Sequence, residues 1–148
     1  MNEDFKKIEE KITLIKKENL KQKNDIEEMF INNERNVDEM IGEFLKVIDS
    51  FDKSEIVVKE KGLDQEENVQ KAIIRMLQPK KVVTTILDKY NVQKIDILGK
   101  LVNDDLCTIV ETEPDSEKED GIVVSIEKQG YLRGSRLIRR AEVVVVKN

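Results

Sequence analysis

A repeat of apolar residues in the first third of the chain constrains the fold more than any other sequence feature. Between Phe5 and Phe51, apolar or uncharged residues recur at steps of three and four residues. A stripe this narrow is typical of a long helix that pairs with another helix along a coiled-coil seam. The seam residues are Phe5, Ile8, Ile12, Ile15, Asn19, Gln22, Ile26, Met29, Asn33, Val37, Met40, Phe44, Val47 and Phe51.

Three amides, Asn19, Gln22 and Asn33, interrupt this seam. A polar seam residue fixes the register of a coiled coil at some cost in stability, and it favours a parallel pair. We therefore expect a homodimer. An intramolecular helical hairpin is the alternative, but no second heptad stretch of similar length follows in the chain. The expected dimer interface contains Asn19, Ile26, Met29, Phe44, Val47, Ile48 and Phe51.

The chain after the seam is expected to form further helices as far as Tyr90, with a loop over residues 59–64. The first helix is expected to end near Lys53–Ser54, after a segment whose apolar face is broad enough for burial in a helical bundle. Residues 65–77 and 80–90 have helical periodicity, and Pro79 between them is expected to break or kink the helix. Asn91 suits the position after the last helix, since asparagine tolerates the left-handed conformation.

From Val92 onward the apolar residues form short runs typical of strands, over residues 92–98, 106–110, 121–126 and 141–146. Asp120–Gly121 is a good hairpin loop sequence. The expected fold class is therefore α+β. It consists of a coiled-coil stem helix over residues 1–43, a dimeric helical bundle over residues 44–90 and a small all-β domain over residues 91–148.

The composition excludes most kinds of catalytic site. The 148 residues include no histidine and one cysteine, Cys107, so intramolecular disulfides, Cys/His zinc sites and histidine-dependent catalysis are ruled out. Cys107 lies in an apolar run and is expected to be a small strand residue rather than a nucleophile. Acidic pairs such as Asp104–Asp105 lie in expected loops without a nearby base or nucleophile. We expect neither an enzyme nor a metal or other cofactor.

Charge and hydropathy limit the partners. The formal net charge is −5 and basic residues are spread over helix faces, so no nucleic-acid surface is expected. The sequence has neither a signal-peptide pattern nor an apolar run of about 18 residues, so no membrane partner is expected. These features favour a reduced, soluble, cytoplasmic protein.

A cluster of arginines lies between Gly130 and the valine-rich run of residues 141–146. It comprises Arg133, Arg136, Arg139 and Arg140. The simplest interpretation is a hairpin with a solvated cationic rim. The alternative is a site that binds carboxylates of a partner. Arg136 discriminates between the two, because a rim would tolerate lysine there and a site that needs guanidinium geometry would not.

These residues resemble the C-terminal signature of the GrpE family, G-Y-x-x-x-x-R-x-[IL]-R-x-A-x-V-x-V. Gly130-Tyr131, Arg136-Leu137-Ile138-Arg139, Ala141 and the valine run match it without a gap. Residues 44–53 resemble the family segment L-L-P-V-[IL]-D-x-[LF]-[DE]-[RK], with Lys46 in place of the proline. A third family segment, which carries a D-P pair and a histidine, is represented after Gly99 by the glycine and the apolar positions alone.

The resemblance implies a homodimeric co-chaperone of protein folding and the stress response. Such a protein binds the nucleotide-binding domain of a DnaK-type chaperone and holds the nucleotide cleft open, so that ADP leaves. The residues that the resemblance assigns to partner binding are Arg136, Arg139, Gly130, Tyr131 and Leu137. The alternative function is a homodimeric coiled-coil scaffold or adaptor whose β domain binds another protein.

Overall fold

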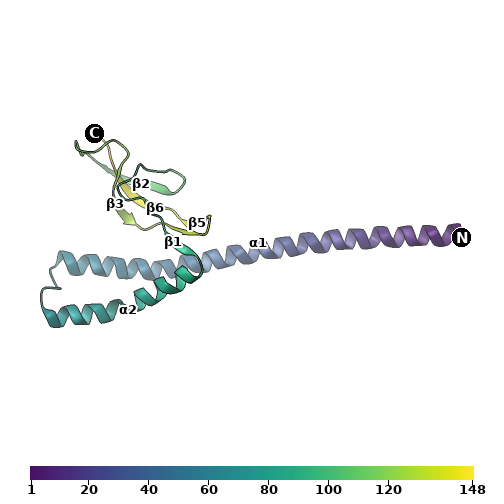
Figure 1. The fold of residues 1–148 in the computed structure, drawn as a ribbon, viewed down its shortest axis with the longest axis horizontal. Helices are drawn as coiled ribbons and strands as arrows, with labels where there is room; N and C mark the ends of the chain where they lie inside the picture. The colour runs from purple at the N-terminus through teal and green to yellow at the C-terminus, as the bar shows by residue number, and fades with distance from the viewer. The chain divides into compact units, whose positions relative to one another are not determined.

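The computed structural model describes residues 1–148, in which two helices precede six strands (Figure 1). The predicted α+β class is confirmed, since the chain consists of a long N-terminal helix, a second helix and a small C-terminal β domain. The elements are α1 (Asn2–Glu60), α2 (Glu67–Lys89), β1 (Val92–Lys94), β2 (Cys107–Glu113), β3 (Val123–Lys128), β4 (Tyr131–Arg133), β5 (Arg136–Arg139) and β6 (Ala141–Val146). The chain divides into two compact units, residues 1–38 and 39–148.

The first unit is a single uninterrupted stretch of α1. It contains neither glycine nor proline, so nothing in its sequence breaks the helix. Its seam side chains face solvent: Phe5 is 66% exposed, Ile12 46% and Met29 71%. Long isolated helices depend on packing of an apolar face for most of their stability, and within this unit the chain supplies no such packing.

Helix α1 extends further than the sequence predicted, to Glu60 rather than Lys53–Ser54. Residues 54–60 contain no helix breaker, and the first glycine after them is Gly62, which adopts a φ of 58°. The N–H of Gly62 donates to the carbonyl of Lys59, and the N–H of Leu63 donates to that of Val58. This pair of hydrogen bonds around a left-handed glycine is a Schellman motif, so Gly62 ends the helix.

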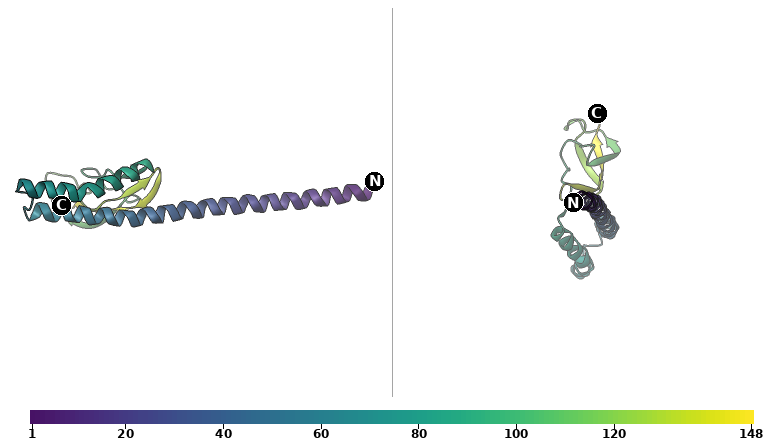
Figure 2. Two further views of the ribbon diagram at one scale, coloured as in Figure 1. Left: turned by 90° about the horizontal axis from the view of Figure 1, so that it is seen from below. Right: turned by 90° about the vertical axis from the view of Figure 1, so that its right-hand side faces the viewer.

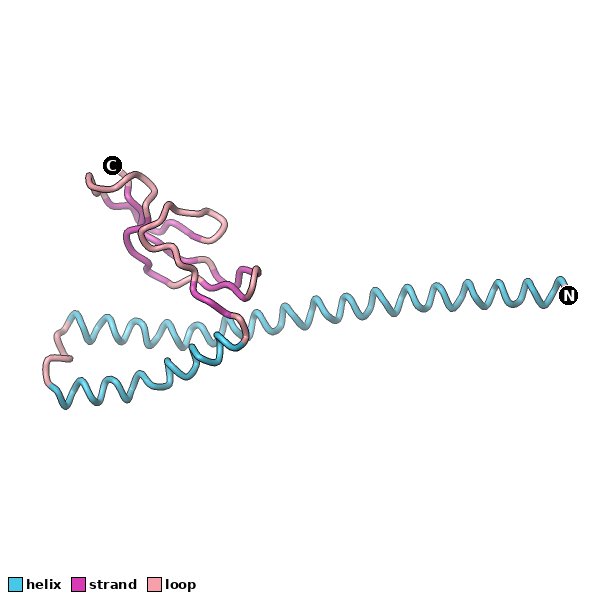
Figure 3. The backbone as a smooth tube through the Cα atoms, in the orientation of Figure 1, coloured by secondary structure: helices cyan, strands magenta, loops and turns pink.

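The sequence predicted a break or a kink at Pro79, and α2 is not broken there. Figure 3 shows it as one coil that bends along its length and runs back beside α1 of the second unit. The proline removes one backbone donor from the helix, and the residue after it, Lys80, bonds to Asp52 of α1. Asn91 has a φ of 59°, which confirms the predicted left-handed residue after the helix.

Within the second unit, α1 carries two apolar stripes with different surroundings. Ile41, Leu45 and Ile48 are buried by the chain itself, with exposures of 5%, 0% and 1%. Met40, Phe44 and Val47 are 55%, 48% and 46% exposed. Ile48 therefore belongs to the interior of the protomer rather than to the expected dimer interface. The broad apolar face predicted from the sequence therefore consists of two stripes. One is buried within the chain, and the other is exposed to solvent.

The β domain contains two three-stranded sheets, with strand orders β1-β4-β5 and β2-β6-β3. Strand β6 lies between β2, which is parallel to it, and β3, which is antiparallel. Asp120–Gly121 is therefore not the loop of a β2–β3 hairpin, because β6 separates these strands. The four consecutive valines of β6 are all buried, as expected for a central strand covered on both faces. Ile95, Ile97, Cys107, Val123, Ala141, Val143 and Val145 form the core cluster.

Candidate functional site

The strands β4 and β5 form the hairpin in which the predicted partner-binding residues lie. Tyr131 pairs with Arg139, Leu132 with Leu137 and Arg133 with Arg136. The turn contains Gly134 with a φ of 59°, and the Gly134 N–H donates to the Asn91 carbonyl over 2.9 Å. Strand β4 also pairs with β1, which follows α2 almost directly. Figure 2 shows α2 lying alongside the later part of α1. The β4–β5 hairpin is therefore held beside the C-terminal end of α2, through the pairing of β4 with β1.

Gly130 precedes the hairpin at a point where no side chain fits. A Cβ atom on it would lie 2.5 Å from the Ala141 nitrogen and 2.7 Å from the Ile95 Cδ1 atom. Its carbonyl accepts a hydrogen bond from the Ile95 N–H over 3.0 Å. Unlike Gly134, Gly130 does not have a positive φ. The glycine is therefore needed for close approach of two backbones, which is a structural role.

Tyr131 is an interior residue, with 3% of its surface exposed. Its hydroxyl is buried and has no hydrogen-bond partner within the chain. Burial, followed by the negative charge of Asp52, raises the pKa of Tyr131 to about 12. The guanidinium of Arg139 lies over the ring, 5.6 Å from its centroid. Tyr131 therefore packs on the buried side of the hairpin.

Arg139 faces the helices rather than solvent. Its Nη1 donates to Asp49 Oδ2 over 2.7 Å and its Nη2 donates to Asp49 Oδ1 over 2.8 Å. Its Nε and Nη2 also donate to the Gln129 carbonyl, over 3.1 and 2.8 Å. Both charged side chains are only 18% exposed. The donors of Arg139 are therefore directed at Asp49 and Gln129 within the chain.

The outer surface of the hairpin retains two of the five predicted residues. Arg136 is exposed and Leu137 is 40% exposed, next to each other at the start of β5. Arg140 is exposed just beyond the strand. The surface that a partner can reach therefore combines guanidinium groups with one aliphatic side chain, whereas Gly130, Tyr131 and Arg139 support it from within.

A second ion-pair cluster connects α1 to α2. The Lys80 Nζ lies 2.6 Å from Asp52 Oδ1, and it also donates to Glu55. Burial of Lys80 disfavours its charged form, but hydrogen bonds to Asp52 and Glu55 outweigh this effect and raise its pKa. Asp49, Asp52 and Glu55 recur every three residues along α1, so one row of carboxylates bonds to both β5 and α2.

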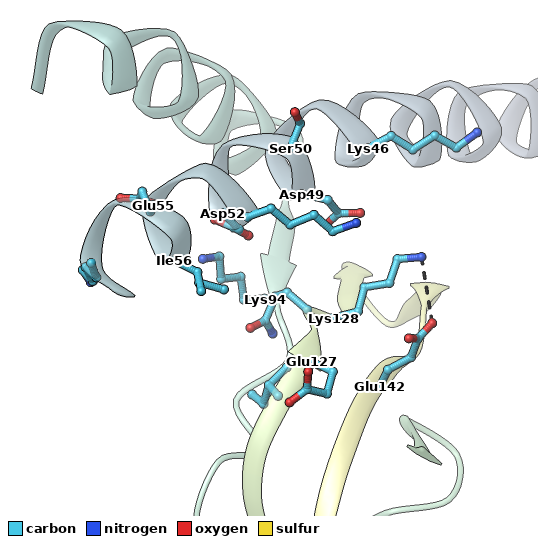
Figure 4. A pocket seen from close by; sticks show the side chains of 14 residues that line it. Lys46, Asp49, Ser50, Asp52, Glu55, Ile56, Lys94, Glu127, Lys128 and Glu142 are labelled. Atoms are coloured by element: carbon cyan, nitrogen blue, oxygen red, sulfur yellow. Dashed lines mark ion pairs between the residues drawn. The ribbon is translucent and has the colours of Figure 1, made fainter. Parts of the chain in front are cut away.

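An open groove of about 830 Å³ lies between residues 46–59 of α1 and residues 126–129 of the β domain. Figure 4 shows Lys46, Asp49 and Asp52 on the helix side, and Glu127 and Lys128 on the β side. The Lys128 Nζ lies 3.9 Å from Glu142 Oε1. The lining is mostly charged and of mixed sign, which differs from the mainly apolar lining usual for small-molecule sites.

No group of three or more His, Cys, Asp or Glu side chains is placed to hold a metal ion. Cys107 is a free thiol buried in the core of the β domain, as the sequence predicted. Neither helix has the length and apolarity that crossing a membrane requires.

The fold and the hairpin agree with a comparison to known families, in which the GrpE family model matches residues 1–147. The chain belongs to the GrpE family. The predicted resemblance is confirmed. Members of the GrpE family are non-enzymatic co-chaperones that act as nucleotide exchange factors for DnaK.

Curated GrpE relatives match most of the chain. Protein GrpE of Alkalilimnicola ehrlichii is 29% identical over 109 residues, which cover 74% of this chain and 48% of the relative. Protein GrpE of Francisella tularensis subsp. holarctica is 28% identical over an alignment of 155 positions, covering 97% of this chain and 75% of the relative. The same values hold for Protein GrpE of Francisella tularensis subsp. tularensis. The chain thus spans about half of the first relative and three quarters of the others.

Sequence reasoning missed the intramolecular partners of the site. Asp49 was recognised as part of a GrpE-like segment but received no role, and Lys80 was treated only as the start of a helix. The available signal was that Asp49 and Arg139 occupy the two segments in which identity to the family pattern is densest.

Proposed function

We propose that this chain is a homodimeric nucleotide exchange factor that binds the nucleotide-binding domain of a DnaK-type chaperone and holds its nucleotide cleft open. The observation that carries this proposal is the match of the GrpE family model to residues 1–147. The match includes the β4–β5 hairpin, where the signature residue Arg136 and its neighbour Leu137 are exposed.

The outer face of the hairpin is the proposed contact surface. Arg136 carries a guanidinium that can donate two parallel hydrogen bonds to one carboxylate, and Leu137 beside it offers an apolar surface. An arginine next to an aliphatic residue suits a small protein interface with one ion pair at its centre. Chaperone residues of negative charge are the proposed complement.

Exchange follows from coupled binding equilibria. If the hairpin binds the open form of the chaperone's cleft more tightly than the closed form, it weakens nucleotide binding by the same factor by which nucleotide weakens its own binding. No catalytic group is needed, since the free energy comes from the difference in affinity between two conformations of the chaperone.

Homodimerisation is part of the proposal. The seam of the first unit is exposed from Phe5 to Met29, and Met40, Phe44 and Val47 continue it in the second unit. Apolar side chains repeating at coiled-coil spacing are buried when two such helices pair. A cytoplasmic location, expected from the sequence, also stays a prediction.

Release of nucleotide tests the proposal. A DnaK-type chaperone is loaded with fluorescent ADP and mixed with the protein in a stopped-flow instrument with excess unlabelled nucleotide. We expect release to accelerate with protein concentration and to saturate. Bovine serum albumin at the same concentration serves as the control. If release is as slow with this protein as with albumin, while the protein is folded and dimeric, the coiled-coil adaptor becomes the better assignment.

A further inference from the structure

One contact joins the two segments in which this chain most resembles its family. Asp49 lies in α1 and Arg139 in β5, 90 residues later in the chain. Two parallel hydrogen bonds of 2.7 and 2.8 Å connect their charged ends. A bidentate pair of this kind fixes the direction of both side chains, and it is stronger than a pair of neutral groups.

The surroundings of Arg139 leave it little freedom. Its remaining hydrogen bonds go to the Gln129 carbonyl, and its guanidinium lies over the Tyr131 ring. Tyr131 is the cross-strand neighbour of Arg139 in the hairpin. The arginine therefore connects three parts of the second unit: the helix α1, Gln129 two residues before the hairpin, and the hairpin itself.

A direct contact of Arg139 with the chaperone would require this arrangement to break. The guanidinium would lose its hydrogen bonds to Asp49 and Gln129, and Asp49, only 18% exposed, would be left without its partner. Leaving a desolvated charge unpaired is costly, so Arg139 is better suited to an internal role.

We propose that the Asp49–Arg139 pair is a positioning contact, which fixes the β4–β5 hairpin on α1 and so presents Arg136 and Leu137 to the chaperone in one orientation. This inference rests on the proposed function. Arg136 and Arg139 are the two ends of β5, so a rotation at Arg139 moves Arg136 with it. Without the pair, the hairpin samples orientations that cannot dock on the chaperone. The apparent affinity then falls in proportion to the fraction of molecules whose hairpin is still in the docking orientation.

The test is a double-mutant cycle with Asp49→Asn and Arg139→Gln, alone and together, on ADP release from a DnaK-type chaperone. We expect each single substitution to raise the half-saturating concentration by about tenfold while the saturating release rate is retained. The double variant should be no worse than the worse single variant, because one contact is lost in all three. Asp96→Asn and Arg75→Gln are the matched controls, since Asp96 pairs only with Lys100 near the surface and Arg75 is exposed on α2.

Three results would overturn the proposal. The first is an unchanged half-saturating concentration in Asp49→Asn. The second is an additive loss in the double variant, which would make Arg139 a direct contact with the chaperone. The third is a lower saturating rate at an unchanged half-saturating concentration, which would place the defect after docking. If the asparagine variant does not fold, Arg139→Lys replaces it, and we expect a smaller rise because one ammonium cannot bond to both oxygens and to Gln129 in the fork geometry.

A readout without the chaperone separates this inference from the proposed function. Amide hydrogen exchange of residues 130–140 is followed by mass spectrometry in the unmodified protein and in the three variants. We expect at least about tenfold faster exchange in every variant, to the same extent in all. If exchange of residues 130–140 is unchanged in the variants, the positioning role is overturned, even if the unmodified protein accelerates ADP release from the chaperone. If exchange is faster in the variants but the unmodified protein does not accelerate ADP release, the positioning contact stands and the proposed function is rejected.

Discussion

Lys80 of α2 lies between two carboxylates of α1, with its Nζ 2.6 Å from Asp52 Oδ1 and bonded also to Glu55. Its side chain is only 19% exposed, so these bonds are partly shielded from solvent. We expect Lys80→Met to lower the free energy of unfolding of the second unit by about 1–2 kcal/mol, since hydrogen bonds to charged groups contribute roughly 1.5–3 kcal/mol. Urea unfolding followed by circular dichroism measures the change.

The matched control for Lys80 is Lys71→Met in the same helix. Lys71 pairs with Glu67 one turn away, and both side chains are more than half exposed. We expect a loss of at most about 0.5 kcal/mol. Equal losses in the two variants would show that the bonds between α1 and α2 contribute no more than a surface pair.

Stability should fall on the alkaline side. The pKa of Lys80 is raised above 10.5 in the folded chain, so its stabilising contribution is complete below pH 10.5 and is lost as pH rises through the higher folded value. Tyr131 loses its proton near pH 10.0 when unfolded and near 12 when folded, so stability also falls between these values. Urea unfolding at increasing pH measures both losses.

Tyr131→Phe isolates the tyrosine contribution. The Tyr131 hydroxyl has no hydrogen-bond partner in the chain, so its removal should change stability at neutral pH by less than about 1 kcal/mol. The alkaline loss should be smaller in this variant. Tyr90→Phe is the control, because Tyr90 is 67% exposed, and its alkaline profile should match that of the unmodified protein. Identical alkaline profiles for all three proteins would contradict the assignment to Tyr131.

Gly130→Ala should destabilise the β domain by at least about 2 kcal/mol. The added Cβ would meet the Ala141 backbone nitrogen at 2.5 Å, and backbone cannot move aside as a flexible side chain can. Gly42→Ala is the control, because nothing lies within 4 Å of its Cβ position and alanine favours a helix by roughly 1 kcal/mol. Thermal melting compares the two. A Gly130→Ala protein that melts at the unmodified temperature would show that the backbones can separate there.

Substitutions at the adjacent residues Phe44 and Leu45 should affect dimerisation and folding stability separately. Phe44 is 48% exposed on the seam stripe and Leu45 is 0% exposed inside the protomer. We expect Phe44→Glu to weaken dimerisation by roughly tenfold or more while the fold is retained, since burial of a phenylalanine contributes about 1.5–3 kcal/mol. Leu45→Ala should instead cost about 2–5 kcal/mol of folding stability. Sedimentation equilibrium and urea unfolding check these outcomes, and an unmodified protein that is monomeric at tens of micromolar would remove the dimer from the account.

Local signals in the sequence were sufficient for the presence of the helices, for a C-terminal β domain and for the conformation of Asn91, although α1 ends at Glu60 rather than at the predicted Lys53–Ser54. They failed where the deciding interaction is distant in sequence. A break or kink was predicted at Pro79, and α2 continues through it, while the bonds of the next residue, Lys80, to Asp52 and Glu55 of α1 were not predicted. Strands β2 and β3 are neighbours in sequence and not in the sheet, because β6 pairs with both.

The same reason explains the reassigned site residues. The arginines at both ends of β5 look equivalent in the sequence, and only the position of Asp49, 90 residues earlier, distinguishes Arg139 from Arg136. Ile48 was placed in the dimer interface because the apolar face of α1 is broad there. Which half of that face the protomer covers depends on packing that no spacing pattern contains.

The most direct test of the account is ADP release from a DnaK-type chaperone by Arg136→Ala, compared with the unmodified protein and with Arg140→Ala. Loss of one partner of an interfacial ion pair costs about 2–5 kcal/mol, or roughly thirtyfold to several thousandfold in affinity. We predict that Arg136→Ala loses most of the acceleration at limiting concentration, with circular dichroism and the dimer unchanged, and that Arg136→Lys recovers little of it. Arg140→Ala should mainly slow association, with less effect at high salt. Acceleration by Arg136→Ala equal to that of the unmodified protein would contradict a contact through the outer face of the hairpin.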